Sequence, residues 1–292
     1  MKVLILGGTG MLGHKLVQRF EEPFETWTSI QASFSEVERF GIFERDRTIE
    51  DVRAIDLTSV RSSIETIRPD VVVNAIGVIK RLPTSNNVSK MLLINSIFPH
   101  RLAALSSEFR FRLIQISTDC VFDGKRGNYN EEDDTNATDL YGRSKSLGEI
   151  SDGNCLTLRT SIIGRELATH HSLIEWFLSN SGGKVNGFVN AIYSGFPTIV
   201  FADIISNLIL EHKDLKGIFH VSSDPIDKFQ LLNLVNEHFR AGITIDRADD
   251  FTIDRSLDST KFRNVTGFRP RPWEEMIASM AADAMPYEKW RQ

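Results

Sequence analysis

The sequence is poor in cysteine, lacks a long apolar run and shows no cluster of basic residues. Its 292 residues include only two cysteines, Cys120 and Cys155, in no C-x-x-C pair, so neither a disulfide framework nor a zinc site is expected. No apolar run reaches the roughly 18 residues that cross a bilayer. The formal net charge is −5 and the lysines and arginines are scattered, which argues against a nucleic-acid-binding surface. Acidic residues and histidines form no cluster that would demand a metal.

The N-terminal residues lead directly into a short apolar strand, Val3 to Leu6. They lack the longer apolar run and small-residue cleavage site of a signal peptide. The hydrophobic fraction of 41% and the charged fraction of 25% are those of an ordinary globular protein. We therefore expect a cytoplasmic protein with a packed core and a small-molecule ligand.

Strands and helices alternate through the first half of the chain, which predicts an α/β fold with a Rossmann-type doubly wound parallel sheet over residues 1–165. Residues 166–292 alternate more loosely and are expected to form a smaller C-terminal α/β substrate lobe. The boundary is approximate and the segments of the two parts can interleave. Residues 31–51 read as an irregular, charged insertion. The expected strands of the first half are Lys2–Leu6, Glu25–Ile30, Val52–Leu57, Asp70–Ile76, Arg112–Ser117 and Leu156–Arg159.

Gly7, Gly10 and Gly13 follow the first strand and open a helix. In this G-x-x-G-x-x-G pattern the first glycine allows a tight turn, the second lets the backbone approach a pyrophosphate, and the third lets helix and strand pack closely. The helix N-terminus also favours phosphate. A turn without a ligand is the alternative, but the strand–turn–helix context favours a dinucleotide. The expected cofactor contacts are Gly7, Thr9, Gly10, Met11, Leu12 and Gly13 in this turn.

Two further strand ends are expected to touch the cofactor. Asp56 and Leu57 follow the third expected strand, where an adenine edge would lie. Small residues at the end of the fourth strand would let the cofactor pass close to the backbone. A helix-capping aspartate and a tight turn are the respective alternatives. The residues at the fourth strand end are Asn74, Ala75, Ile76 and Gly77.

The cofactor is expected to be NADP or NAD. NAD-preferring sites often carry a carboxylate at the end of the second strand, and Thr26–Ile30 has none there, so a 2′-phosphate is not repelled and NADP is favoured. Arg39 and Arg45 in the insertion are candidate partners of that phosphate. A solvated loop position is the alternative for each.

Tyr141 and Lys145 stand four residues apart and therefore share one helix face. A nearby ammonium favours the phenolate and would lower the pKa of the tyrosine. The lysine can also bind the nicotinamide ribose, while the tyrosine hands its proton to a ketone oxygen. Thr118 ends a strand, where its hydroxyl could hold the same oxygen. This set of residues predicts the reduction of a ketone or the oxidation of an alcohol.

Together these motifs resemble the extended short-chain dehydrogenase/reductases, and within them the dTDP-4-dehydrorhamnose reductases. Those enzymes show S-T-D-Y-V-F-D-G, Y-G-x-[ST]-K and L-R-T, which Ser117–Gly124, Tyr141–Lys145 and Leu158–Thr160 match. The resemblance implies Thr118, Tyr141 and Lys145 as a catalytic triad, and places Asn95 of the long helix near the cofactor. It implies NAD(P)H-dependent reduction of a nucleotide-linked 4-keto-6-deoxy sugar in polysaccharide biosynthesis.

The resemblance also implies a set of substrate contacts. Tyr193–Thr198 is similar to the G-x-P-T segment beside the sugar nucleotide, and Asp254–Asp258 resembles a shortened R-P-x-x-S-x-L-D segment. Lys80 and Arg81 are unlike the family, and would either meet a substrate diphosphate or lie in a solvated loop. The expected substrate-binding residues are Lys80, Thr118, Asp119, Val121, Phe122, Tyr193 and Arg255.

Two other functions stay open at this point. Cys120 replaces the glutamate of sugar-nucleotide 4,6-dehydratases, and a thiol with a pKa of about 8.5 is ill suited to remove a sugar C5 proton, which disfavours dehydration. A nucleotide-sugar 4-epimerase remains an alternative, as does a non-catalytic dinucleotide-binding regulatory subunit. The helices expected at Val88–Phe109 and from Tyr141 could also pair in a homodimer.

Overall fold

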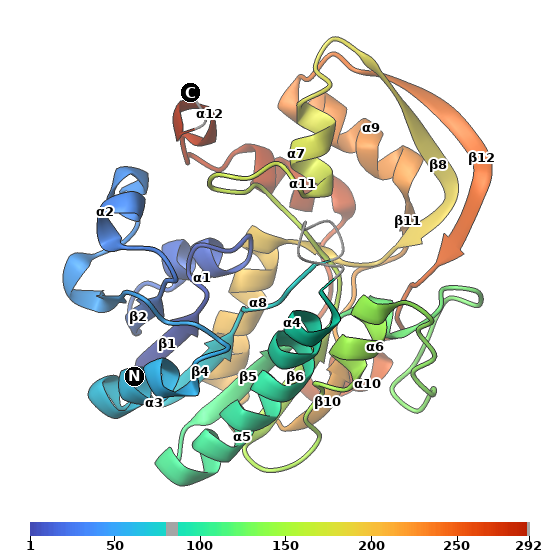
Figure 1. Cartoon of the computed structure of the whole chain (residues 1–292). Helices are drawn as coiled ribbons and strands as arrows, with labels where there is room; N and C mark the ends of the chain where they lie inside the picture. The colour runs from blue at the N-terminus through green and yellow to red at the C-terminus, as the bar shows by residue number, and fades with distance from the viewer. Residues whose placement is uncertain (80–86, 291–292) are drawn as a thin grey trace.

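A seven-stranded parallel sheet forms the centre of the molecule (Figure 1). The computed structural model describes residues 1–79 and 87–290. The strand order is β10-β6-β5-β4-β1-β2-β3, and every neighbouring pair runs parallel. This order confirms the predicted Rossmann-type fold, because the chain winds outward from β1 first in one direction and then in the other. The strands are β1 (Lys2–Leu6), β2 (Glu25–Ser29), β3 (Thr48–Ile49), β4 (Val71–Asn74), β5 (Arg112–Ile116), β6 (Cys155–Arg159) and β10 (Gly217–His220).

Both faces of this sheet are buried, and β1 shows how its residues divide between them. Val3 and Ile5 point into one hydrophobic core with α1 and α8, whereas Leu4 and Leu6 point into a second core with α3 and α5. Strands covered on both faces read as continuous apolar runs, which is why the N-terminus was recognisable as a buried strand. The helices of the two layers are α1 (Gly13–Arg19), α3 (Leu57–Ile67), α4 (Val88–Leu92), α5 (Phe98–Phe109), α6 (Leu140–Ser146) and α8 (Thr198–Glu211).

The strand predicted at Val52–Leu57 is wrong. The third strand is the two-residue β3, and the segment after it runs as an extended turn in which Val52 and Ala54 are buried under the sheet edge. Asp56 ends this turn as the N-cap of α3, where its carboxylate accepts the backbone N–H of Thr58 at 3.0 Å. The alternation of apolar residues therefore marks a buried turn and not a strand.

The long helix expected at Val88–Phe109 contains an irregularity that precedes Pro99. Residues Leu93–Ile97 form a π-helical turn, η4, between α4 and α5. Pro99 is the second residue of α5 and follows this π-helical turn directly.

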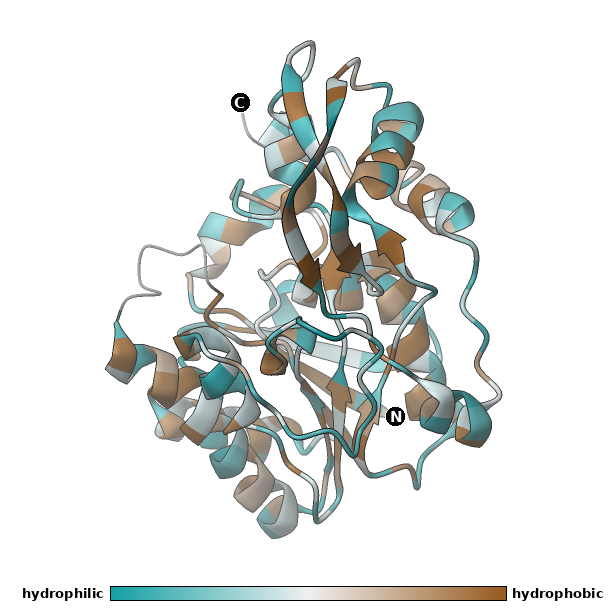
Figure 2. Ribbon diagram, turned by 90° about the vertical axis from the view of Figure 1, so that its right-hand side faces the viewer, coloured by the Kyte–Doolittle hydropathy of each residue, from teal (hydrophilic) through white to brown (hydrophobic). Residues whose placement is uncertain are grey.

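The C-terminal residues form a smaller lobe built around a long two-stranded arm (Figure 1). Strand β8 (Lys184–Tyr193) pairs in parallel with β12 (Thr244–Asp254) and antiparallel with the short β11 (Ile226–Asp227). Figure 2 shows alternating brown and teal bands along these strands, as expected for a sheet with one solvated face. The remaining elements are β7 (Ile162–Ile163), β9 (Phe196–Pro197), α7 (Leu173–Leu178), α9 (Lys228–Phe239), α10 (Thr260–Thr266), α11 (Trp273–Ala281) and α12 (Tyr287–Trp290).

Segments from beyond residue 165 take part in the central sheet and its helix layers. Strand β10 comes from beyond residue 165 and pairs with β6 at the edge of the central sheet. Helix α8 also comes from beyond residue 165, and it packs beside α1. The central sheet therefore needs residues from both halves.

The insertion at residues 31–51 is folded and contacts the C-terminus. It contains α2 (Phe34–Val37) and the 3₁₀ turns η1 (Glu38–Phe40) and η2 (Arg45–Arg47). Its aromatic residues share a separate small core with Leu167 and Tyr287. The rings of Phe40 and Trp290 meet edge to face with centroids 5.1 Å apart. The insertion thus provides a docking surface for α12.

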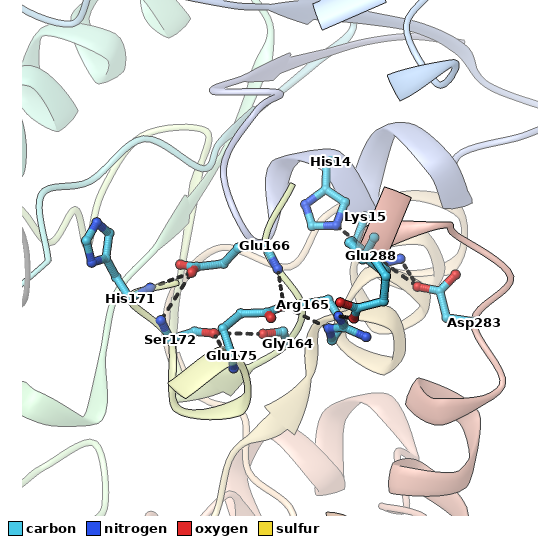
Figure 3. A network of polar contacts seen from close by, with 11 residues as sticks. His14, Lys15, Gly164, Arg165, Glu166, His171, Ser172, Glu175, Asp283 and Glu288 are labelled. Atoms are coloured by element: carbon cyan, nitrogen blue, oxygen red, sulfur yellow. Dashed lines mark hydrogen bonds and ion pairs between the residues drawn. The ribbon is translucent and has the colours of Figure 1, made fainter. Parts of the chain in front are cut away.

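Polar contacts join the same C-terminal segment to helix α1 (Figure 3). Lys15 and Asp283 form an ion pair whose side chains are only 2% and 3% exposed. The ring of His14 bridges two segments, with Nδ1 2.8 Å from the carbonyl oxygen of Gly10 and Nε2 2.9 Å from the hydroxyl of Tyr287. Burial lowers the pKa of His14 to about 3, so this ring is neutral. The helix that follows the glycine turn is therefore fixed to the end of the chain.

A second group of charges holds α12 against α7 (Figure 3). The guanidinium of Arg165 donates to Glu175 at 2.8 Å and also pairs with Glu288. Arg165 also lies over the ring of Tyr287, 4.7 Å from its centroid. One arginine thus joins the strand-to-helix loop of the lobe to the last helix.

We expect Asp283→Asn to lower the free energy of unfolding by about 3–5 kcal/mol, because it leaves the ammonium of Lys15 buried without its partner. Asp203 provides a matched control, since its ion pair with Arg19 lies on the same helix α1 but is 43–44% exposed. Asp203→Asn should cost less than about 1 kcal/mol. Urea unfolding of both variants measures the difference, and equal losses would contradict the account.

Within the described residues, no helix combines the length and apolar character needed to span a membrane. Apolar residues do remain exposed on the α4–α5 face and after α6, with Ile97 42% and Leu147 62% exposed. The homodimer stays a prediction.

Candidate functional site

The glycine turn after β1 has the geometry that its spacing predicts. Gly7 has a φ of +88°, a left-handed conformation, and a Cβ there would lie 2.8 Å from Cγ1 of Ile76. A Cβ at Gly13 would collide with the carbonyl group of Gly7. The first glycine therefore permits the turn and the third permits close packing of helix on strand, which confirms both predicted roles.

A cavity of about 240 Å³ lies at this turn, at the carboxyl ends of β1, β2 and β4. This is the edge at which open parallel sheets bind their ligands. Six of the expected cofactor residues line it, three from the glycine turn and three from the loop after β4. They are Gly7, Thr9, Gly10, Ala75, Ile76 and Gly77. The cavity is also lined by Ser29 and Gln31 at the end of β2 and by residues 52–55 after β3, which the sequence analysis did not assign.

Other expected cofactor residues lie outside the cavity lining. Leu12 is 5% exposed and belongs to the hydrophobic core, and Gly13 serves the packing described above. Asp56 caps α3, which was the alternative considered for it. The neighbours Met11 and Leu57 do not line the cavity either. After β3 the cavity is therefore lined by residues 52–55 and not by Asp56 and Leu57.

Asn74 and Asn95 both support the cavity wall from behind. The amide of Asn74 donates to Oε1 of Gln115 at 2.8 Å and accepts from the N–H of Ile76 at 3.1 Å. Asn95 exchanges two hydrogen bonds of 2.9 Å with the backbone of Val78, and also donates to the hydroxyl of Ser144 at 3.2 Å. Both are 1% exposed, so we reassign them from cofactor contact to positioning of the loop after β4.

The π-helical turn η4 explains how Asn95 reaches this loop. It falls where the long helix passes between the loop after β4 and helix α6, and Asn95 lies at its centre. A Cβ at Gly148, after α6, would collide with the carbonyl oxygen of Asn95. The extra residue in the turn and the close approach of Gly148 let one side chain join β4, η4 and α6.

Thr118 and Tyr141 meet at the end of β5. Thr118 is the N-cap of the 3₁₀ turn η5 (Asp119–Val121), and its hydroxyl shares a hydrogen bond with the phenol of Tyr141. Helix α6 begins one residue before Tyr141, after Asp139 caps it through the N–H of Gly142 at 3.0 Å. A Cβ at Gly142 would collide with the carbonyl oxygen of Cys120. The sequence analysis missed this glycine, although its place directly after the tyrosine was a usable signal.

Lys145 lies one turn further along α6 and is 7% exposed. Its ammonium donates to the carbonyl oxygen of Ile116 at 2.6 Å. Burial lowers the pKa of Lys145 to about 8, while the negative charge of Glu149 opposes that shift. The lysine is therefore anchored at the end of β5, beside the strand end that carries Thr118.

The pKa of Tyr141 shifts in the direction opposite to our expectation. Burial raises it above the ordinary value, and the neighbouring Cys120 adds to that shift, while the hydrogen bond to Thr118 opposes it. The expected lowering by Lys145 is absent because that ammonium is directed to Ile116 and desolvation of the phenol dominates. Tyr141 therefore keeps its proton at neutral pH.

A buried ion pair between Arg159 and Glu149 lies beside the end of β5. Arg159 on β6 donates two hydrogen bonds to Glu149, at 2.8 and 2.7 Å, and Ser117 donates to the same carboxylate at 2.6 Å. Arg159 also contacts His220 on β10, with the two nitrogens 3.1 Å apart. The arginine of the L-R-T motif thus connects the end of β5 to β10. Glu149 was not assigned, although it follows Lys145 by four residues.

The expected substrate residues separate into two groups. Asp119 lies near Arg255 and Tyr193, and burial raises the pKa of Asp119 while the charge of Arg255 opposes the shift. Val121 and Phe122, however, are fully buried, and Phe122 stacks on Tyr129 at 4.2 Å, so these two belong to a small core and not to the substrate surface. Lys80 and Arg81 lie outside the described residues.

Comparison with known proteins identifies the family. The family model described as "RmlD substrate binding domain" matches residues 1–285. The chain belongs to this family. The match confirms the resemblance on which the sequence analysis relied.

Relatives with different names resemble this chain at modest identity. The chain is 26% identical to the spore coat polysaccharide biosynthesis protein SpsK of Bacillus subtilis (strain 168), over 94% of this chain and 95% of that protein. It is 24% identical to the methionine adenosyltransferase 2 subunit beta of Xenopus tropicalis, over 94% and 80%. It is also 24% identical to the dTDP-4-dehydrorhamnose reductase of Aggregatibacter actinomycetemcomitans, over 97% and 99%.

Solved structures share the fold. A dTDP-4-dehydrorhamnose reductase from Bacillus anthracis, in complex with NADP, superposes with a TM-score of 0.78 at 18% identity, covering 96% of this chain and 98% of that one. A hypothetical dTDP-4-dehydrorhamnose reductase from Sulfolobus tokodaii superposes with a TM-score of 0.77 at 27% identity, covering 94% and 98%.

We expect Asn95→Ala to lower the free energy of unfolding by about 2–4 kcal/mol, because it leaves the buried N–H and C=O of Val78 without their hydrogen-bond partner. Asn87→Ala is the matched control. That asparagine also accepts a backbone N–H, from Lys90 at 2.9 Å, but it is an exposed helix cap and should cost about 1 kcal/mol. Chemical denaturation compares the two, and a smaller loss for Asn95→Ala would refute its positioning role.

Proposed function

We propose that this chain is an NAD(P)H-dependent oxidoreductase that reduces a nucleotide-linked 4-keto-6-deoxy sugar. The names of several relatives support a reductase, and the name of the B. subtilis relative supports a place in polysaccharide biosynthesis. The observation that carries the proposal is the hydrogen-bonded pair of hydroxyls, Thr118 and Tyr141, one strand away from the cavity at the glycine turn.

The cavity suits part of a nicotinamide dinucleotide. A Cβ at Gly10 would meet only the carbonyl oxygen of Gly7, at 3.3 Å, so the turn is open on its outer side. Gly10 and Thr9 would face the pyrophosphate there, while residues 52–55 would face the adenosine. The cofactor supplies a hydride to the substrate carbonyl carbon when it is bound.

Tyr141 on α6, beside the end of β5, supplies the proton. Tyr141 is protonated at neutral pH, as a general acid must be before it acts. Thr118 can hold the same carbonyl oxygen through its hydroxyl. Lys145 carries an ammonium below pH 8 and would bind the ribose of the nicotinamide half. Asp119, Tyr193 and Arg255 lie together beyond Tyr141 and would hold the sugar nucleotide.

The relatives named as a methionine adenosyltransferase subunit favour a second candidate, a dinucleotide-binding regulatory subunit. Thr118, Tyr141 and Lys145 argue for the reductase, because a subunit without catalysis needs neither a buried phenol bonded to a threonine hydroxyl nor a buried lysine on the same helix. A nucleotide-sugar 4-epimerase would retain the same triad. It would turn over substrate without net consumption of reduced cofactor, so a stoichiometric assay separates all three functions.

Tyr141→Phe should reduce the rate of NADPH or NADH oxidation with dTDP-4-keto-6-deoxy sugars by about 10²–10⁴-fold, since it removes the proton donor. Cofactor binding should stay unchanged. Tyr129→Phe is the matched control, because the Tyr129 hydroxyl bonds to Asp123 at 2.9 Å and is outside the site. An active Tyr141→Phe variant would remove Tyr141 from the mechanism, and an inactive wild-type chain that binds cofactor would favour the regulatory subunit.

The pH dependence of kcat/KM should follow the deprotonation of Lys145. Its ammonium is present below pH 8 and is lost above it, so kcat/KM, which reflects the free enzyme, should fall about tenfold per unit as the pH rises past about 8. Tyr141 does not limit this range because its pKa is raised. Lys145→Arg keeps a permanent charge and should abolish the decline near pH 8 in whatever activity it retains. A wild-type profile flat to pH 10 would contradict the assignment.

A further inference from the structure

The cavity at the glycine turn carries a cation at the position where the adenosine ribose is expected. Strands β2 and β3 pair in parallel, with Ser29 opposite Ile49. Beyond them the N–H of Val52 donates to the carbonyl oxygen of Ile30 at 3.0 Å. Arg53 is the next residue, so it stands beside the carboxyl end of β2. That strand end is where Rossmann-type folds read the 2′ position of the ribose.

The charges of the cavity wall are of one sign. Among the described residues that line it, the charged ones are Arg53 and Lys90, and no carboxylate faces them from the wall. The end of β2 supplies only the neutral Ser29 and Gln31. A 2′-phosphate would therefore meet an attractive field, whereas the carboxylate that binds the free 2′-hydroxyl of NAD is missing.

The backbone of Arg53 is fixed while its guanidinium is accessible. Its N–H donates to the hydroxyl of Ser59 at 3.1 Å, and its carbonyl oxygen accepts from the N–H of Asp56 at 2.9 Å. The side chain is 53% exposed, and its ion-pair partner is the 78%-exposed Asp51 at 3.6 Å. An exposed pair of this length is weak, so a phosphate can displace the carboxylate.

The two arginines that the sequence analysis considered for this task are directed elsewhere. The guanidinium of Arg39 lies over the ring of Phe40, 4.9 Å from its centroid. Arg45 lies over Phe34 and pairs with Glu50 at 2.8 Å. Neither lines the cavity.

We propose that Arg53 binds the 2′-phosphate of the adenosine ribose and makes this chain select NADP(H) over NAD(H). The inference rests on the proposed function in so far as the cavity holds a nicotinamide dinucleotide. Guanidinium groups match phosphate oxygens with two parallel hydrogen bonds, which makes arginine suited to such a contact.

Equilibrium binding of NADPH and NADH to the full chain, measured by calorimetry, tests the proposal without relying on catalysis. Wild type should bind NADPH at least tenfold more tightly. Arg53→Gln should weaken NADPH binding about 10- to 100-fold and leave NADH binding within twofold. Asp51→Asn, which frees the guanidinium, should tighten NADPH binding a few-fold. Arg39→Gln is the matched control and should change neither affinity.

A smaller probe pair isolates the phosphate contact. Adenosine 2′,5′-bisphosphate should bind more tightly than 5′-AMP to wild type, and Arg53→Gln should abolish that difference. Equal binding of NADPH and NADH by wild type, or equal weakening of both by Arg53→Gln, would overturn the role of Arg53 while leaving the reductase proposal intact. Failure of both dinucleotides to bind would overturn the proposed function as well.

Discussion

The parallel register of β1, β4 and β5 is the constraint on which the site depends. Leu6 lies opposite Asn74, and Asn74 lies opposite Gln115, so the three strands end at one level. The glycine turn, the loop after β4 and the end of β5 therefore emerge side by side. Since side chains of β1 and β4 are buried on both faces, a slip by one residue would turn each of them to the wrong core. The packing of the sheet thus fixes where cofactor and proton donor can meet.

Desolvation sets the chemistry at that edge. Tyr141 and Lys145 are neighbours on α6, yet burial moves their pKa values in opposite directions, because it disfavours the phenolate of one and the ammonium of the other. The phenol therefore stays protonated at neutral pH, and the pKa of the lysine is lowered to about 8. Both follow from the close approach that Gly142 allows between α6 and the end of β5. A bulkier residue there would separate the groups and expose them to water.

Local spacing could be predicted from the sequence, while the partners of polar atoms could not. Tyr141, Lys145 and the glycine turn follow from helix and turn geometry alone. The family resemblance predicted that Asn95 contacts the cofactor. In the structure its side-chain amide forms hydrogen bonds with the backbone of Val78, 17 residues away. Arg53 was overlooked because its segment read as a strand. The hydrogen-bond partners of such residues depend on which loops meet at one edge of the sheet. A short sequence motif does not predict which loops these are.

The C-terminal segment reaches helix α1 directly after the glycine turn, and this explains two features that the sequence left without a role. The insertion after β2 supplies an apolar surface for α12, and α12 in turn presents Tyr287 to His14. His14 holds the carbonyl of Gly10, which belongs to the cavity wall. A short helix of seven residues has few hydrogen bonds of its own, so its orientation relies on such contacts. The insertion and the C-terminus therefore act together to hold the turn that would face the pyrophosphate.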